Sequence, residues 1–380
     1  MSRTLRFGIG AGLVLITLIT VVLLSTVFRP TAAPAGPPAI TVTCLGGSEK
    51  TGLMADQEVK QILQSKYALT IDFRATGSLD QVLLSTDELK QRGVNCLWPS
   101  SASAQLVFEA KHNLADYPGY RAETVLNSPE VIYAGPEGVT ALSTIGIVEK
   151  RNDRYFIVKM KELLLANVLK GKTWTDINAP TLRGPIIVES TNPTQSNSGF
   201  TLYLLQLSIV STNDVYRPPT IQEARVALPT IKALYDAQGL QARSSGFGFD
   251  QWLLEGGELS SPLYAGYESQ IIEKVVQNPQ QATQILKDVR ILYPDPTVYN
   301  EHPVLALNKD AGRLIDALKD PQIQSIAWKR YGFRSILLGV TDLTAFPNMP
   351  LADRIQTTKL PSAEVILMLQ ECLKNGACSK

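Results

Sequence analysis

The sequence predicts an α/β protein with two lobes, each containing a parallel or mixed sheet flanked by helices. Three observations predict this class. At 380 residues the chain is too long for one ordinary compact core. Strand-like and helix-like patterns alternate through residues 40–108, which is typical of a parallel sheet with right-handed crossovers. The same alternation returns between residues 130 and 276, so we expect a second sheet.

The first residues differ in composition from the rest. The stretch from Phe7 to Phe28 has no charged residue and is long enough to cross a bilayer as a helix. Arg3 and Arg6 precede it, and the positive-inside rule then keeps the N-terminus in the cytoplasm. We therefore expect residues 1–28 to be a single-pass anchor in the inner (cytoplasmic) membrane, with the globular body outside the cytoplasm.

A cleaved signal peptide is the alternative interpretation of this segment. Its apolar region is normally shorter, and the only matching cleavage pattern, Ala33-Pro34-Ala35, lies well beyond the apolar stretch. Residues 29–39, "RPTAAPAGPPA", are rich in Pro and Ala and have no apolar periodicity. They are expected to form a semi-stiff tether.

Residues 40–108 contain three strand–turn–helix units with similar turns. "GGSEKT" follows the first strand, "TGSLD" the second and "PSSAS" the third. Such turns meet at the carboxyl edge of a parallel sheet, where open α/β sheets bind ligands. Each turn alone is an ordinary helix start, but their repetition predicts a binding edge. The candidate ligand-binding residues here are Ser48, Gly77, Ser78, Ser100 and Ser101.

The middle of the chain repeats this organisation. "EVIYAG" (130–135) and "GPIIVES" (184–190) predict strands, and residues 155–170 predict a helix. "TNPTQSNSGFTLYLLQL" (191–207) places many hydroxyls and amides before a helix from Gly199 to Val210. One cap needs a single such side chain, so the surplus suggests that the N–H groups of this turn face an anion. The alternative is an ordinary helix N-cap that has more polar side chains than it needs and binds no ligand. The candidates are Thr191, Ser196, Asn197, Ser198 and Gly199.

Two further features bear on the charge of the ligand. Arg243, in "ARSSGFGFD", is the candidate cation, although a surface arginine in a mobile loop is an equal alternative. "SSPLYAGYESQIIEKVV" (260–276) predicts a strand that enters a helix through Tyr267, Glu268 and Ser269, which we include in the site. A carboxylate at Glu268 would repel a fully ionised anion and could instead receive a cationic ligand or a protonated oxyanion.

The end of the chain returns to the first lobe and then leaves it. Residues 289–308 are extended and proline-punctuated, long enough to pass between lobes, and residues 310–333 predict two helices. In the remaining segment, 346–380, a helix from Ser362 to Leu373 places Val365, Leu369 and Cys372 on one face. This face either packs on a lobe or docks a partner.

The four cysteines are consistent with two disulfides in an oxidising compartment. Their order pairs Cys44 with Cys96, each near the end of an apolar strand-like run, and Cys372 with Cys378, which bracket "LKNGA". Free buried thiols are the alternative. A zinc site is not expected, because there is no short C-x-x-C and the two histidines lie far from any cysteine.

The order of these elements resembles the type II periplasmic solute-binding proteins. "STNPTQSNSG" resembles the second-lobe oxyanion loop of the sulfate, phosphate and molybdate receptors. "SPEVIYAG" and "ILYPDPTVYNEHPVLALN" resemble the two hinge strands, and "LKDPQIQSIAWKRYGFR" the penultimate helix pair. The resemblance implies two lobes that grip a ligand in the cleft between them. It divides the body into lobe 1 (40–132 and 296–345), lobe 2 (133–295) and a C-terminal extension (346–380).

Composition excludes other classes of function. Lys and Arg total 36 against 35 Asp and Glu, so no global field attracts nucleic acid. Neither a catalytic motif nor a metal or cofactor motif is present, so we expect a binding protein and no enzyme. The expected partners are a small polar or anionic solute, the membrane and a transporter permease. The alternative is a sensory or ligand-independent scaffold that uses the two lobes to bind a protein.

Overall fold

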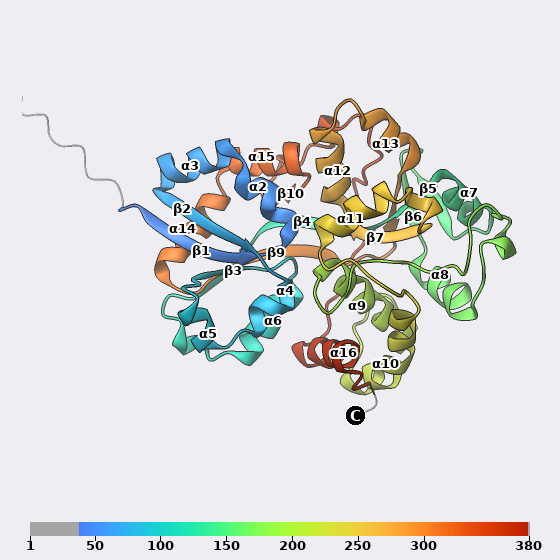
Figure 1. The fold of residues 1–380 in the computed structure, drawn as a ribbon, viewed down its shortest axis with the longest axis horizontal. Helices are drawn as coiled ribbons and strands as arrows, with labels where there is room; N and C mark the ends of the chain where they lie inside the picture. The colour runs from blue at the N-terminus through green and yellow to red at the C-terminus, as the bar shows by residue number, and fades with distance from the viewer. Residues whose placement is uncertain (1–37, 379–380) are drawn as a thin grey trace, which may run out of the picture. The chain divides into compact units, whose positions relative to one another are not determined.

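The computed structural model describes residues 38–378 of the chain (Figure 1). The expected membrane anchor, and all of the expected tether except Pro38 and Ala39, lie outside the described residues. Among the helices that are described, none has the length and apolar character needed to cross a membrane.

One mixed sheet of ten strands organises residues 40–335, and strand β4 (Arg121–Ala134) links its two halves. The first half of β4 pairs with β9 (Tyr299–Ala306) as far as Pro129, and from Glu130 onward it pairs with β7 (Leu263–Tyr267). We use this change of partner to define the lobes. Lobe 1 comprises residues 40–129 and 299–335, and lobe 2 comprises residues 130–294. The boundaries expected from the sequence stay a prediction.

Lobe 1 begins as a series of parallel strands with helical crossovers. β1 pairs in parallel with β2 on one side and β3 on the other, and β3 continues the sheet to antiparallel β9. The elements of this lobe in chain order, besides β4 and β9, are β1 (Ile40–Gly46), the 3-10 helix η1 (Ser48–Lys50), α2 (Thr51–Ala55), α3 (Gln57–Tyr67), β2 (Leu69–Ala75), α4 (Ser78–Leu83), α5 (Thr86–Gln91), β3 (Cys96–Trp98), α6 (Ala102–Lys111), the 3-10 helix η2 (Leu114–Asp116), α14 (Lys309–Leu318), α15 (Pro321–Tyr331) and β10 (Arg334–Ser335).

Lobe 2 has fewer paired strands and more helix. Its elements in chain order, besides the second half of β4, are α7 (Pro136–Thr144), β5 (Val148–Arg151), β6 (Tyr155–Val158), α8 (Met160–Ala166), η3 (Val168–Lys170), η4 (Thr175–Ile177), α9 (Asn197–Thr212), α10 (Ile221–Asp236), α11 (Ser245–Leu254), η5 (Gly257–Leu259), β7, α12 (Glu268–Gln277), α13 (Ala282–Asp288) and β8 (Arg290–Pro294). The 3-10 helix η6 (Leu343–Ala345) and the helix α16 (Ala363–Asn375) follow in the C-terminal part of the described chain.

Three secondary-structure predictions are wrong in detail. The helix expected over residues 155–170 begins as strand β6, because "YFIV" gains main-chain partners on both β5 and β8. The strand expected in residues 184–190 is reduced to isolated bridges. The helix that the sequence predicts from Met54 to Ser65 is divided between α2 and α3, because the Asp56 side chain accepts from the N–H groups of Glu58 and Val59 and so starts α3.

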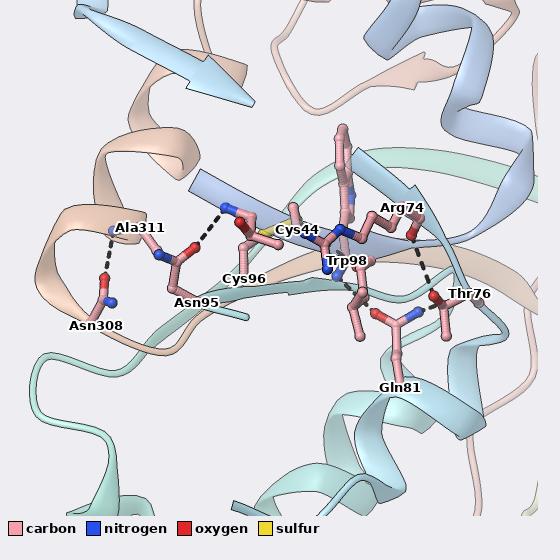
Figure 2. Close-up of a disulfide and its surroundings, with 11 residues drawn as sticks. Cys44, Arg74, Thr76, Gln81, Asn95, Cys96, Trp98, Asn308 and Ala311 are labelled. Carbon is pink, nitrogen blue, oxygen red and sulfur yellow. Dashed lines mark hydrogen bonds between the residues drawn. A yellow bond between two sulfur atoms is a disulfide. The ribbon is translucent and has the colours of Figure 1, made fainter. Parts of the chain in front are cut away.

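A disulfide and one glutamine hold the strand ends of lobe 1 in place (Figure 2). Cys44 on β1 and Cys96 on β3 are directly opposite each other in the register and are bonded, as the sequence predicted. From α4, Gln81 Oε1 accepts from Trp98 N at 3.0 Å, and Gln81 Nε2 donates to Thr76 O at 3.2 Å. The turns after β2 and β3 are therefore fixed relative to one another. The second predicted disulfide, Cys372–Cys378, is also formed.

Helix α16 packs against both lobes. Its buried face includes Val365, Leu369 and Cys372, as the spacing predicted, and it contacts α6 of lobe 1 and α10 of lobe 2 (Figure 1). One hydrophobic cluster contains these residues together with Phe108 of lobe 1 and Leu204 of lobe 2. The two lobes and α16 therefore share a continuous apolar core.

Candidate functional site

The turns that follow β1, β2 and β3 meet α9 and α11 of lobe 2 around a cavity of about 360 Å³, which we call the cleft cavity. Half of the fourteen predicted site residues line it: Ser48, Gly77, Ser78, Ser100, Ser196, Asn197 and Arg243. Further lining residues that sequence reasoning missed are Gly47, Glu49, Ala75, Thr76, Asp80, Gln195, Ser244 and Ser245. The cavity thus combines both lobes and is mostly surrounded by small polar groups.

Four helical segments begin at the cleft cavity without a hydrogen bond to their own N-cap side chain, although Gly199 N in the first turn of α9 donates to Thr191 Oγ1. Their N-cap residues are Gly47 for η1, Gly77 for α4, Ser196 for α9 and Ser244 for α11, and none of these side chains accepts from the first turn. The N–H groups at the start of a helix have no acceptor within the helix and carry a partial positive charge. Four such starts around one small cavity form a surface suited to an anion.

A cluster of hydroxyls joins the starts of α9 and α11. Ser196 Oγ lies 3.0 Å from Ser245 Oγ, and Ser198 Oγ lies 3.2 Å from the same atom and 2.8 Å from Thr191 Oγ1. Thr191 Oγ1 in turn accepts from Gly199 N at 3.0 Å. Thr191, Ser198 and Gly199 therefore support the cavity wall from behind and do not line it. At Gly199 any Cβ would collide with the Thr191 carbonyl.

Asn197 connects the two lobes at the floor of the cleft cavity. Its Nδ2 lies 3.2 Å from Ser100 O and Asn300 Oδ1 of lobe 1 and 2.9 Å from the hydroxyl oxygen of Tyr267. The side chain is 5 % exposed, and Oδ1 has no partner among the described residues. This cavity-lining residue retains an unpaired acceptor that a ligand donor could satisfy.

A buried ion pair lies beside the cavity, formed by Glu49 and Lys50. Lys50 Nζ donates to Glu49 Oε1 at 2.5 Å and to Ser100 Oγ at 3.1 Å, while Ser100 Oγ donates to the same Glu49 oxygen at 2.5 Å. Burial alone would raise the pKa of Glu49, but the charge of Lys50, helped by the neighbouring His302, holds this pKa well below its usual range. The carboxylate is therefore ionised and compensated.

His302 approaches the same carboxylate from β9. Its Nδ1 lies 3.5 Å from Glu49 Oε1, and the ring is fully buried. Burial, with the Lys50 charge, lowers the pKa of His302 to about 4, so the imidazole is neutral near pH 7. Sequence reasoning missed the cluster of Glu49, Lys50 and His302, because "SEK" (48–50) looks like a solvated helix start.

Two charged residues at the cleft cavity are exposed, and they have opposite signs. Arg243 makes no ion pair with any residue that the structure describes. Asp80 lies at the start of α4, and its partial burial raises its pKa despite the opposing effect of Lys374. The cavity therefore has little net charge, and a bound anion would be held mainly by N–H and hydroxyl dipoles.

The remaining predicted residues lie outside the cavity. Ser101 caps α6, and Tyr267 is buried against Asn197. The expectation that Glu268 faces a ligand needs correction. Both of its oxygens accept from Arg334 at 2.7 Å, and Tyr293 donates to Oε1 at 2.5 Å. The adjacent Ser269 bonds to Ser128 instead. No group of three or more potential metal ligands occurs in the described part of the chain.

Comparison with solved structures identifies the fold. A periplasmic thiamin binding protein has a TM-score of 0.58 at 11 % identity, covering 91 % of this chain and 99 % of its own. The IdiA (FutA) protein of Trichodesmium, in complex with iron and citrate ligands, scores 0.52 at 9 % identity over 90 % and 100 %. Iron-bound HitA from Pseudomonas aeruginosa scores 0.51 at 12 % identity over 88 % and 99 %.

These similarities cover nearly the whole of each chain. The protein therefore has the two-lobe α/β fold of the type II periplasmic binding proteins. No known protein-family model and no curated protein matches the chain by sequence. At such low sequence identity, similarity of fold does not indicate which ligand binds, so the function has to be argued from the site.

Proposed function

We propose that the protein is an extracytoplasmic solute-binding protein that captures a small polar solute, an oxyanion, in the cleft cavity. One observation carries the proposal: four uncapped helix starts from both lobes meet at one cavity, with the cation Arg243 at its edge. The volume of about 360 Å³ suits a small ligand. The near balance of Arg243 and Asp80 favours an oxyanion that retains a proton or is bound chiefly through hydrogen bonds.

The cellular setting is part of the same proposal. The apolar segment from Phe7 to Phe28 would hold the protein in the inner membrane, and an ABC-type transporter or a sensing system would receive the solute. Protease added to the outer face of that membrane should then remove the globular body. A body that is cleaved only from the cytoplasmic side contradicts this topology.

Ligand capture can be tested by thermal shift. The full-length protein is screened against phosphate, sulfate, molybdate, tungstate, amino acids and sugars. A ligand at 1,000 times its dissociation constant adds about 4 kcal/mol to the stability of the folded state. Ser48→Leu in lobe 1 and Ser196→Leu in lobe 2 should each abolish the shift, because each fills the cavity and removes a donor. Ser65→Leu, on the exposed face of α3, is the matched control and should keep it.

Two results contradict the binding site. One is the absence of a shift with every solute in the panel. The other is a shift that survives both Ser48→Leu and Ser196→Leu, because the ligand would then bind elsewhere.

A second candidate function is a scaffold that binds a protein partner without a ligand. The observation in its favour is the apolar core that α16 shares with both lobes, since this core resists the opening that a receptor uses to admit its ligand. A pull-down with the purified protein, with and without the best ligand, separates the two candidates. A scaffold should retain a protein partner whether or not a ligand is present, whereas a receptor should bind a small solute with high affinity on its own.

A further inference from the structure

A second cavity of about 570 Å³ adjoins the cleft cavity on lobe 2. The two cavities share Arg243 and Ser244 in their walls, so a ligand held at the start of α11 can reach into both. The walls of this second cavity differ from the hydroxyl- and amide-rich walls of the first. They contain aromatic side chains and carboxylates, and they call for a different chemical group.

Aromatic rings form one wall of the second cavity. Trp252 and Tyr264 are stacked, with ring centroids 5.9 Å apart and an interplanar angle of 21°. Phe247, in the same wall, is 64 % exposed, which is unusual for a ring of this size. Tyr264 is 6 % exposed, yet its hydroxyl has no partner among the described residues. A buried unpaired hydroxyl in a cavity wall is a group that a ligand can satisfy.

The space next to that hydroxyl depends on a glycine. A Cβ at Gly248 would collide with the Tyr264 hydroxyl and come within 2.8 Å of Thr191 Cγ2. Gly248 also lines the second cavity. The glycine thus lets α11 approach the Tyr264 ring closely, which fixes this wall relative to the start of the helix.

Two carboxylates line the second cavity together with Arg243, which this cavity shares with the cleft cavity. Glu189 and Glu255 both line it, and neither forms an ion pair within residues 38–378. Burial raises the pKa of Glu189, and Glu255 raises it further while Ser261 opposes the change. Two carboxylates near aromatic faces favour a positively charged organic group, which gains both charge attraction and cation–π contact.

We propose that the second cavity is a subsite for a cationic organic group joined to the oxyanion that the cleft cavity holds. The ligand class is an oxyanion ester that carries an ammonium group. This inference rests on the proposed function and goes further by naming the substrate class. Arg243, shared by both cavities, would lie beside the ester linkage, with the ammonium group facing Glu189 and Glu255.

The test compares matched esters by isothermal titration calorimetry on the full-length protein. The probes are phosphocholine and choline sulfate, with glycerol 3-phosphate and methyl sulfate as counterparts that keep the oxyanion and lack the ammonium group, and inorganic phosphate, inorganic sulfate and choline alone. We expect one choline ester to bind at least 10-fold more tightly than its counterpart without the ammonium group. In Glu189→Gln/Glu255→Gln this preference should fall below 3-fold, while the affinity for the ester without the ammonium group stays within 3-fold or increases.

Glu162→Gln/Glu364→Gln is the control, because it removes two exposed carboxylates that line neither cavity and changes the net charge equally. It should keep the preference for the choline ester. If the esters without an ammonium group or the inorganic anions bind and the choline esters bind no better, the subsite is refuted and the proposed function stands. If no oxyanion and no ester binds, both are refuted. A preference that is lost equally in the control variant also overturns the subsite, because net charge alone then explains it.

Discussion

Removing the Lys50 charge should destabilise the protein strongly, because Glu49 would stay buried without its partner. The two side chains are 0 % and 3 % exposed, and their charged atoms are 2.5 Å apart. Breaking a buried ion pair by removing one partner typically costs about 3 to 5 kcal/mol. His302 is neutral at pH 7, since its pKa is about 4, and gives no immediate replacement. We therefore expect Lys50→Met to lose about 3 to 5 kcal/mol of the free energy of unfolding.

The double variant Glu49→Gln/Lys50→Met isolates the cause. It removes both charges and keeps side chains of similar volume, so its loss should be less than about 1.5 kcal/mol. Urea denaturation of both variants at pH 7, followed by circular dichroism, measures the difference. A single variant that loses less than about 1 kcal/mol, or a double variant that loses as much as the single one, refutes the reasoning.

The pH dependence provides an independent check on the same pair. In the wild type the pKa of Glu49 is lowered, so its contribution to stability is present above the unfolded-state pKa of about 4.3 and is lost as the pH falls below it. In Lys50→Met the buried Glu49 carboxylate has no cation beside it. A proton on Glu49 neutralises this charge, and a proton on His302 balances it, so the folded-state pKa of the group that takes the proton is higher than in the wild type. Stability of this variant relative to the wild type should thus recover as the pH falls from 8 to 5.

Three further predictions concern other parts of the fold. Burial raises the pKa of Glu273 to about 7 in the folded protein, whereas the unfolded-state pKa is about 4.3. Between these two pH values the folded state keeps a proton on Glu273 that the unfolded state has lost. Stability should fall by about 1 to 3 kcal/mol as the pH rises through that window, and Glu273→Gln should remove this slope from urea titrations. Gly199→Ala should cost about 1 to 3 kcal/mol because its Cβ meets the facing loop carbonyl, whereas Gly312→Ala, which has open space in α14, should be neutral or stabilising. A Gly199→Ala variant as stable as the wild type, or a clearly destabilised Gly312→Ala variant, contradicts the packing described around these two glycines. Cys44→Ser/Cys96→Ser should lose about 2 to 4 kcal/mol of the free energy of unfolding. Unreduced digests of the wild type should contain the two peptides linked by this disulfide, and free thiols at both positions would exclude the bond.

The turns of the candidate site could be predicted because their signals are local. Small polar residues directly after a strand identify a helix start whatever the rest of the chain does, and Ser48, Gly77, Ser100 and Ser196 were found in this way. The pairing of Cys44 with Cys96 also followed from local signals, since both cysteines lie near the ends of strand-like runs.

The parts that could not be predicted depend on tertiary contacts. Residues 155–158 form a strand only because β5 and β8 lie on either side of them. The adjacent charges of Glu49 and Lys50 look solvated in sequence, and they are buried because Ser100, in the turn after β3, and His302, on β9, come from distant parts of the chain. Glu268 looked like a cleft residue because it starts a helix after a strand, and a partner 66 positions away, Arg334, holds it elsewhere.

The apolar core around α16 bears most directly on how a ligand could enter. A hinge opening at β4 and β9 that separates the lobes would have to move side chains such as Phe108 and Leu204 apart. Exposing three or four large apolar side chains costs about 5 to 12 kcal/mol, at roughly 1.5 to 3 kcal/mol each. Binding with a dissociation constant of 1 μM supplies about 8 kcal/mol, so the two energies are similar in size. A cost of 5 kcal/mol leaves the open form below about 0.1 % of molecules, and wide opening is then unfavourable without a partner.

The apo protein should therefore scatter as a closed particle, and the ligand would enter through rearrangement of the exposed loop that carries Arg243. An apo structure with the lobes apart would show that this core yields more easily than its burial implies.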